Sequence, residues 1–161
     1  MNLDNQHPEH RNRIMSDSRK ILSAAIIQIA RLSPPTAQSV QTILGGQWRR
    51  VNHGLWTEWV AAEDSTPDGV VSLSFAEMPH STRQRASLRV ALGGSSQGAE
   101  HTLQELRRSF TEWLPVVNSI PTGGSIPLVS GERTSITPNA ILTIRRHNNG
   151  QPEGIFVEWL R

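Results

Sequence analysis

Alternation of apolar and polar residues is the clearest pattern along the chain, and it predicts strands in the middle of the sequence. In residues 71–75 and again in residues 88–92, every second residue is apolar, and the residues between them are serine, arginine or alanine. A period of two is typical of strands that bury one face. The two runs therefore predict a β-hairpin that is connected through residues 78–84.

Two similar segments predict two more hairpins. Residues 49–60 and 145–160 both begin Arg-Arg-x-Asn-x-Gly, and the second segment then has four extra residues. Both continue with an apolar residue, an aromatic, a β-branched residue, Glu, Trp and an apolar residue. A helix over residues 55–62 is the alternative for the first segment. The run with high β propensity after Gly154 in the second segment favours strands for both.

The turn of the first hairpin sets its expected register. A two-residue turn at residues 53–54 places Arg49 opposite Glu58. The same register in the second segment places Arg145 opposite Glu158. We therefore expect one cross-strand ion pair in each hairpin.

Helical spacing predicts two helices before these strands. Asp17 can cap a first helix over residues 18–32, whose circumference is mostly apolar. Residues 33–34, a serine and a proline, suit the start of a second helix over 34–44, and Gly45 suits its end.

A third helix is predicted after the central hairpin. Apolar residues recur at helical spacing from Leu103 to Leu114, and Pro115 ends the run. Ser96 suits the N-cap. Residues 117–139, rich in Pro, Gly, Ser and Thr, predict either a functional loop or a loop that contains a short strand near 126–129.

These elements predict an α+β fold with a mainly antiparallel sheet of about six strands and helices packed on one face. The expected order is α-α-β-β-β-β-α-β-β. Residues 1–16 are polar without an apolar period and predict a flexible arm, followed by a single domain over 17–161.

The amino-acid composition excludes several kinds of site and partner. The chain has 161 residues and no cysteine, which excludes disulfides and thiol nucleophiles and fits a cytoplasmic protein. The alternative is secretion through a signal-like segment over 15–39. All but one of the 16 basic residues are arginines and the net charge is +2, so charge alone does not demand nucleic acid. The longest apolar run, residues 21–32, is too short to span a membrane.

The glycine-rich segment 93–98 is the main candidate for chemistry. Gly94, Ser95 and Ser96 could bind an anion through backbone N–H groups before the third helix. The segment lacks the Lys of a P-loop, and residue 97 is Gln where a nucleophile elbow has Gly. A small hydrolase or transferase that uses residues 93–101 is therefore the second alternative function. The six histidines are scattered, so we predict no metal site and no cofactor.

Aromatic and arginine residues indicate binding instead. Alternation puts Trp56 on the face opposite Trp59, so Trp56 or its counterpart Phe156 is expected to be partly exposed. The residues predicted to form the binding surface are these two aromatics, the flanking arginines and the densest arginine group: Trp56, Phe156, Arg50, Arg146, Arg83, Arg85 and Arg89.

These observations favour a non-enzymatic protein-binding module of adaptor, chaperone-like or inhibitor type. It would use the sheet surface or an edge strand, and the strand ending at Arg161 is expected at an edge. The expected partner is another protein, with a second copy of the chain as one option and no membrane. The alternative is nucleic acid held by Arg and Trp side chains on the sheet.

Overall fold

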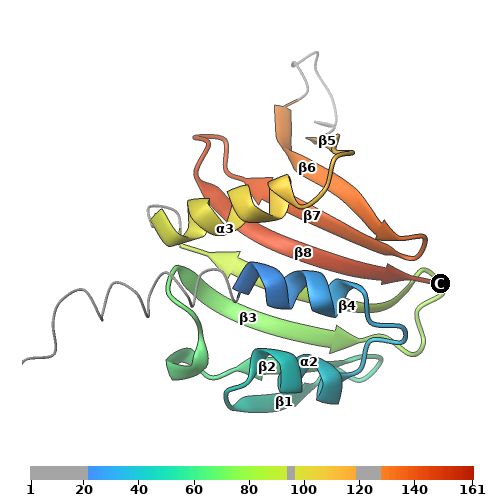
Figure 1. Ribbon diagram of the computed structural model, residues 1–161. Helices are drawn as coiled ribbons and strands as arrows, with labels where there is room; N and C mark the ends of the chain where they lie inside the picture. Colours follow the sequence, from blue (N-terminus) through green and yellow to red (C-terminus); the bar gives the residue numbers. More distant parts are fainter. Residues whose placement is uncertain (1–21, 94–96, 119–127) are drawn as a thin grey trace, which may run out of the picture.

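The computed structural model describes residues 22–93, 97–118 and 128–161. Within these residues, three helices cover one face of a single antiparallel sheet of eight strands (Figure 1). The α+β class, the antiparallel sheet and the placement of the helices on one face are confirmed. The predicted count of six strands is too low. The predicted arm over 1–16, and the capping roles of Asp17 and Ser96, lie outside the described residues.

The eight strands lie in the order β1-β2-β3-β4-β8-β7-β6-β5 across the sheet. In chain order, the elements are a first helix at residues 22–30, α2 (Ala37–Leu44), β1 (Trp48–Asn52), β2 (Thr57–Ala61), the 3-10 helix η1 (Glu63–Ser65), β3 (Val70–Glu77), β4 (Gln84–Leu92), α3 (Gln97–Arg108), β5 (Leu114–Asn118), β6 (Leu128–Thr137), β7 (Ala140–Arg146) and β8 (Pro152–Leu160).

The two strands that the sequence did not predict in full are β5 and β6. The predicted third helix continues to Leu114, but α3 ends at Arg108. Trp113 then closes a turn, because its indole N–H donates to the carbonyls of Arg107 and Phe110, both at 3.0 Å. Leu114 is the first residue of β5. The short strand suggested near 126–129 exists as the longer β6, which pairs with β5 and β7.

The second helix begins later than predicted. Thr36, not Ser33, is the N-cap, and its hydroxyl accepts a hydrogen bond from the Ser39 N–H at 3.2 Å. The Ala37 N–H donates to the Glu77 carboxylate at 2.9 Å, which fixes the start of α2 to β3. The predicted end at Gly45 is confirmed, with a φ of 69° that glycine adopts without strain.

The registers predicted for the two similar hairpins are wrong. Residues 57–61 do form a strand and not a helix, but Arg49 lies opposite Val60 and Glu58 opposite Val51. The reason is the turn. Asn52 accepts a hydrogen bond from the Gly54 N–H through its side chain, and the loop takes residues 53–56 instead of two residues.

The second hairpin departs from its prediction in a different way. Arg145 lies opposite Gly154, and Glu158 lies opposite Ile141. Its connection runs over residues 147–151, and a bulge interrupts the pairing beside it. The two segments are therefore alike in sequence but not in cross-strand pairs.

The predicted edge position of β8 is also wrong. β8 pairs with β4 on one side and β7 on the other, so it lies in the middle of the sheet. The edges of the sheet are β1 and β5.

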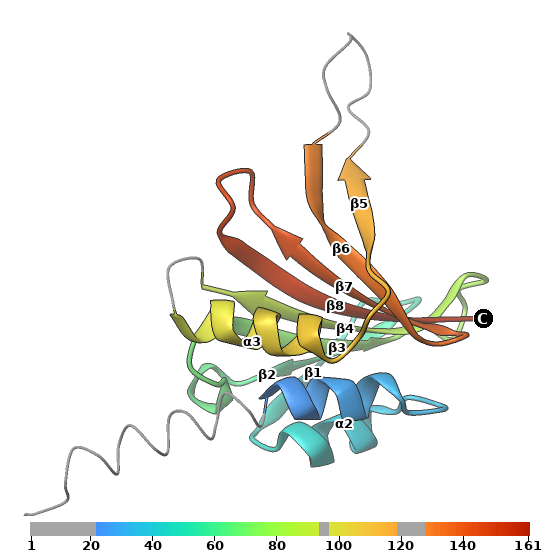
Figure 2. The same cartoon turned by 45° about the horizontal axis from the view of Figure 1, so that its top comes forward.

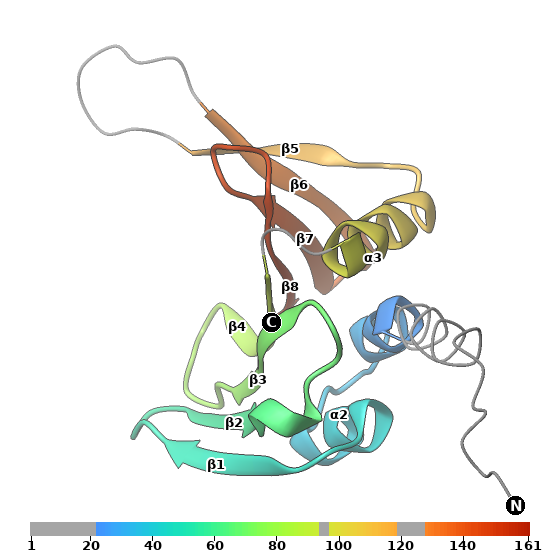
Figure 3. The ribbon, with the colours of Figure 1, turned by 90° about the vertical axis from the view of Figure 1, so that its left-hand side faces the viewer.

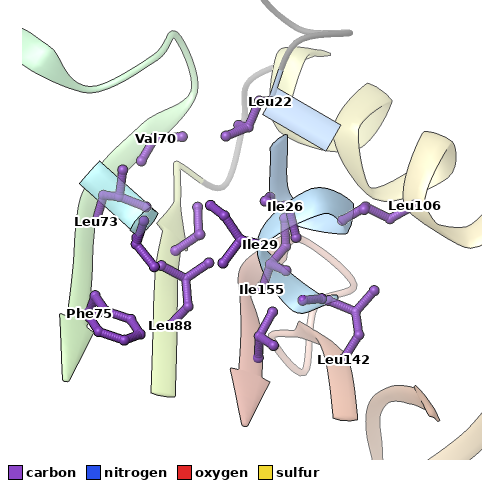
Figure 4. Close-up of a cluster of buried hydrophobic side chains, with 14 of the residues drawn as sticks. Leu22, Ile26, Ile29, Val70, Leu73, Phe75, Leu88, Leu106, Leu142 and Ile155 are labelled. Carbon is purple, nitrogen blue, oxygen red and sulfur yellow. The ribbon is translucent and has the colours of Figure 1, made fainter. Parts of the chain in front are cut away.

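The hydrophobic core lies between the sheet and the helices (Figure 4). Ile26 and Ile29 of the first helix and Leu106 of α3 are fully buried against the sheet. Phe75 and Ile155 meet them from β3 and β8, as alternate residues of each strand point toward the helices. None of the helices in the described residues is long and apolar enough to cross a membrane.

Two leucines provide a matched test of this core. Leu106 is fully buried, whereas Leu114 is 60% exposed. We expect Leu106→Ala to lower the free energy of unfolding by about 2–5 kcal/mol, because it leaves a cavity. Leu114→Ala should change it by less than about 0.5 kcal/mol. Urea unfolding followed by circular dichroism measures both values, and equal losses would contradict the packing of α3 described above.

Candidate binding face

The face of the sheet opposite the helices is open in the described part of the chain. Figures 2 and 3 show the helices together on one side of the sheet, with no element over the other side. Because side chains alternate along each strand, the residues between the core positions point away from the helices. We call the surface that they form the open face.

Cross-strand pairing aligns one residue from each strand in a row across the open face. Each member of this row lies directly opposite the next in the registers of the seven strand pairs. The row reads Arg49, Val60, Ser74, Arg89, Phe156, Thr143, Arg133 and Leu114.

Phe156 lies at the centre of this row and is flanked by two arginines. The guanidinium carbon of Arg145 is 4.9 Å from the centre of the phenyl ring, and that of Arg89 is 5.8 Å from it. Both distances lie in the range of cation–π contacts. Gly154 makes this arrangement possible, because a Cβ there would lie 3.1 Å from the ring and 2.8 Å from the Val90 carbonyl oxygen.

The arginines of the open face make no ion pair or hydrogen bond within the described residues. This holds for the side chains of Arg49, Arg89, Arg133 and Arg145, and all four residues are exposed. The nearby carboxylates have other partners: Glu158 accepts a hydrogen bond from Gln84 at 2.7 Å, and Glu58 lies 3.0 Å from His53. The centre of the open face therefore presents positive charge around an apolar ring.

A cavity of about 540 Å³ adjoins the end of the row where β5 begins. Its walls include Trp113, Leu114 and Ile141, with Arg133 beside them. The pairing of β5 with β6 stops at Arg133, so the rest of β6 has no strand partner on that side. The cavity has the size of a small-molecule or side-chain pocket.

Trp56, a predicted binding residue, lies elsewhere. It belongs to the β1–β2 turn, where its ring stacks on His53 with a centroid distance of 3.8 Å. Arg50 lies opposite Trp59, on the side of the sheet that the helices cover. The structure therefore separates both residues from Phe156, because the expected equivalence of the two hairpins does not hold.

Arg146 has an acidic partner. Its guanidinium donates to both carboxylate oxygens of Glu100, at 2.7 and 2.8 Å, and so joins β7 to α3. Hydrogen bonds from Arg146 lower the pKa of the Glu100 carboxyl below its ordinary value, and those bonds raise the pKa of Arg146. This arginine supports the fold instead of offering a free charge.

The arginine group predicted around the central hairpin is divided among three places. Arg89 lies on the open face, and Arg83 is exposed in the β3–β4 turn. Arg85 occupies a bulge between the pairs made by Gln84 and Ala86, and it lines a cavity with Trp159 on the helix side.

Several residues of the open face, Arg145 and Arg133 among them, were not among the predicted binding residues. Arg145 and Arg133 join Arg89 only through the order β4-β8-β7-β6, which brings together strands far apart in the sequence. Alternation along residues 140–146 could have placed Arg145 on the face opposite the core. No local pattern indicates which strands are neighbours.

The candidates for catalysis gain no support from the structure. Gly94, Ser95 and Ser96 lie outside the described residues. His101 lies 4.0 Å from Glu105 on the same helix, and His80 is exposed in the β3–β4 turn. In the ranges that the structure describes, no group of His, Asp and Glu is arranged to hold a metal ion.

Comparison with known proteins gives no match, whether with family models, with curated proteins or with solved structures.

The Glu100–Arg146 pair makes stability depend on pH. A lowered pKa in the folded state stabilises the fold above the ordinary carboxyl pKa of 4.5, and this contribution is lost as the pH falls through the folded value. Because both side chains are more than a third exposed, Glu100→Gln should cost only about 0.5–1 kcal/mol at neutral pH. The difference in the free energy of unfolding between Glu100→Gln and the wild type should shrink toward zero in acid.

Urea unfolding at pH 7 and pH 3 measures this effect. Glu112→Gln is the matched control, because Glu112 is exposed and makes no ion pair within the described residues. A Glu100→Gln loss that is the same at both pH values would show that the pair contributes through packing and not through charge.

Proposed function

We propose that this protein is a non-enzymatic protein-binding module that holds an acidic segment of a partner protein on its open face. The observation that carries the proposal is the pair of unpartnered arginines, Arg89 and Arg145, on either side of Phe156. With Arg133 and Arg49 in the row of Phe156, four exposed arginines lie on a surface that no helix covers in the described part of the chain.

A carboxylate-bearing partner suits this surface for two reasons. Guanidinium groups bind carboxylates through paired, charge-assisted hydrogen bonds, and these arginines have no acidic partner of their own in the described residues. Phe156 and the cavity beside Arg133 supply apolar surface between the charges. Interfaces commonly combine an aromatic or apolar anchor with arginine in this way.

The surroundings of Phe156 favour a protein over a nucleic acid. A base would have to stack on a ring that two guanidinium groups already flank. Trp59 and Trp159, which could have served as stacking platforms, pack on the helix side against Phe75. The net charge of +2 is also small for a surface that follows a phosphate backbone.

The proposal is tested with a fluorescein-labelled peptide of glutamate and leucine residues, measured by fluorescence anisotropy. A peptide with glutamine in place of glutamate should bind more weakly. The double variant Arg89→Gln/Arg145→Gln should weaken binding by about tenfold or more, since each hydrogen bond to a charged group contributes about 1.5–3 kcal/mol. Phe156→Leu should weaken it by a smaller factor.

Arg50→Gln is the matched control, because Arg50 is exposed but lies on the helix side of the sheet. It should bind the peptide as the wild type does. Oligothymidylate of equal charge is the competing ligand. The proposal fails if the oligonucleotide binds more tightly than the peptide, or if the Arg50 variant loses as much affinity as the double variant.

A further inference from the structure

β6 has an uncovered edge along the last part of its length. β6 has ten residues and β5 has five, and their pairing ends where Leu114 lies opposite Arg133. On its other side, β6 continues to pair with β7 as far as Thr137, which lies opposite Ala140. In the part of the chain that the structure describes, residues 134–137 therefore have a neighbouring strand on one side only.

The backbone of this edge is the first observation that points to a ligand. Successive residues of an antiparallel strand direct their N–H and C=O groups to opposite neighbours. Either Thr134 or Ser135 therefore presents a donor and an acceptor on the uncovered side. Among the described residues, no backbone hydrogen bond from outside the sheet reaches either of them. A bulge between Ser135 and Thr137 makes Thr134 and Ser135 the regular part of the edge.

The cavity of about 540 Å³ beside this edge is the second observation. The chain rises from the end of α3 into β5 (Figure 2), and residues 111–113 lie on this path before the pairing with β6 begins. They form one wall of the cavity, and Thr134 and Ser135 form another. The uncovered edge of β6 therefore faces a bounded space that is large enough for a ligand.

We infer that this space binds one extended segment of a partner protein, which pairs with the uncovered edge of β6 as an added strand. The inference rests on the proposed function in taking a partner protein as the ligand, but it uses backbone groups and not the arginines beside Phe156. In strand addition, main-chain hydrogen bonds hold the peptide and pockets accept its alternate side chains.

The walls of the cavity indicate which side chains the segment carries. Trp113, Leu114 and Ile141 provide apolar surface, which suits a side chain such as leucine. Arg133 and Glu112 line the same cavity with opposite charges, so the residues around the space carry no net charge. We therefore expect an uncharged, apolar segment here, in contrast to the acidic segment on the open face.

A second copy of the chain fits this space less well than a single segment does. Pairing of two whole sheets requires an edge that is free along its length. β5 covers the first part of this edge of β6, and residues 111–113 stand across the cavity from the remainder. The space therefore admits one strand and not the edge of another sheet.

The test uses a six-residue peptide of alternating leucine and threonine with blocked ends, titrated into the full chain and followed in ¹⁵N–¹H spectra. The indole N–H signal of Trp113 should move in a saturable way, because this residue lines the cavity. At about ten times the Kd, hydrogen exchange at either Thr134 or Ser135 should slow about tenfold, because that N–H gains a partner in the complex.

A peptide with methyl groups on alternate backbone nitrogens is the matched ligand control. It keeps the side chains but loses donors needed for strand pairing, so it should bind about tenfold more weakly. Thr111→Trp adds a large ring to the wall opposite β6 and should weaken binding of the first peptide by about tenfold. Leu55→Trp is the control variant, because Leu55 is 74% exposed in the β1–β2 turn, and it should bind as the wild type does.

Three results would overturn the inference. The first is a Trp113 signal that the peptide does not move. The second is unchanged exchange at both Thr134 and Ser135, or equal binding of the methylated peptide, either of which would show that the cavity takes a side chain without strand pairing. The third is loss of binding in Arg89→Gln/Arg145→Gln, which would place the peptide on the open face. If this double variant weakens only the glutamate–leucine peptide, the two sites are separate, so either proposal can fail alone.

Discussion

Burial of one face of an eight-stranded sheet beneath three helices is the constraint on which the rest of this structure depends. Fully buried residues such as Ile26, Leu106 and Ile155 hold the layers together, and each large apolar side chain contributes about 1.5–3 kcal/mol when it is buried. Strand geometry then forces the intervening residues to the other side. The open face is thus a direct consequence of the core: where Ile155 is buried, Phe156 must point away from the helices.

Much of the fold could be predicted because its signals are local. The half-buried strands around Phe75 and Leu88, the helix stop at Gly45 and the α+β class all follow from short-range periodicity and backbone preference. β5 and β6 were harder to predict because proline, glycine and serine dominate that region, and such composition is also typical of loops. The register of the first hairpin was wrong because the turn takes four residues, with a hydrogen bond from the Gly54 N–H to the Asn52 side chain. The register of the second was wrong because its connection runs over residues 147–151 with a bulge beside it.

The residues of the candidate binding face also divide into those with a local signal in the sequence and those without one. Phe156 was predicted because alternation along a single strand is visible in the sequence, and Arg89 because it belongs to the densest group of arginines in the chain. Arg145 and Arg133 were missed because they reach Phe156 only through pairing between strands that are distant in the chain. Arg146, by contrast, was predicted as a free charge, and the structure pairs it with Glu100. Whether an arginine is available to a ligand depends on tertiary neighbours, which no single segment specifies.

The central position of β8 has a consequence for how the molecule assembles. Strands β1 to β4 form one meander of sequential neighbours, and β5 to β7 form another. The strands of each meander can therefore pair with partners that are close in the chain. In the described residues, the two meanders are joined only through β8, which pairs with β4 although about 60 residues separate the two strands in the chain. Because contacts between segments distant in the chain form more slowly than local ones, we expect the pairing of β4 with β8 to be among the last to form during folding. The strand that brings Phe156 to the open face is the same one that unites the two halves.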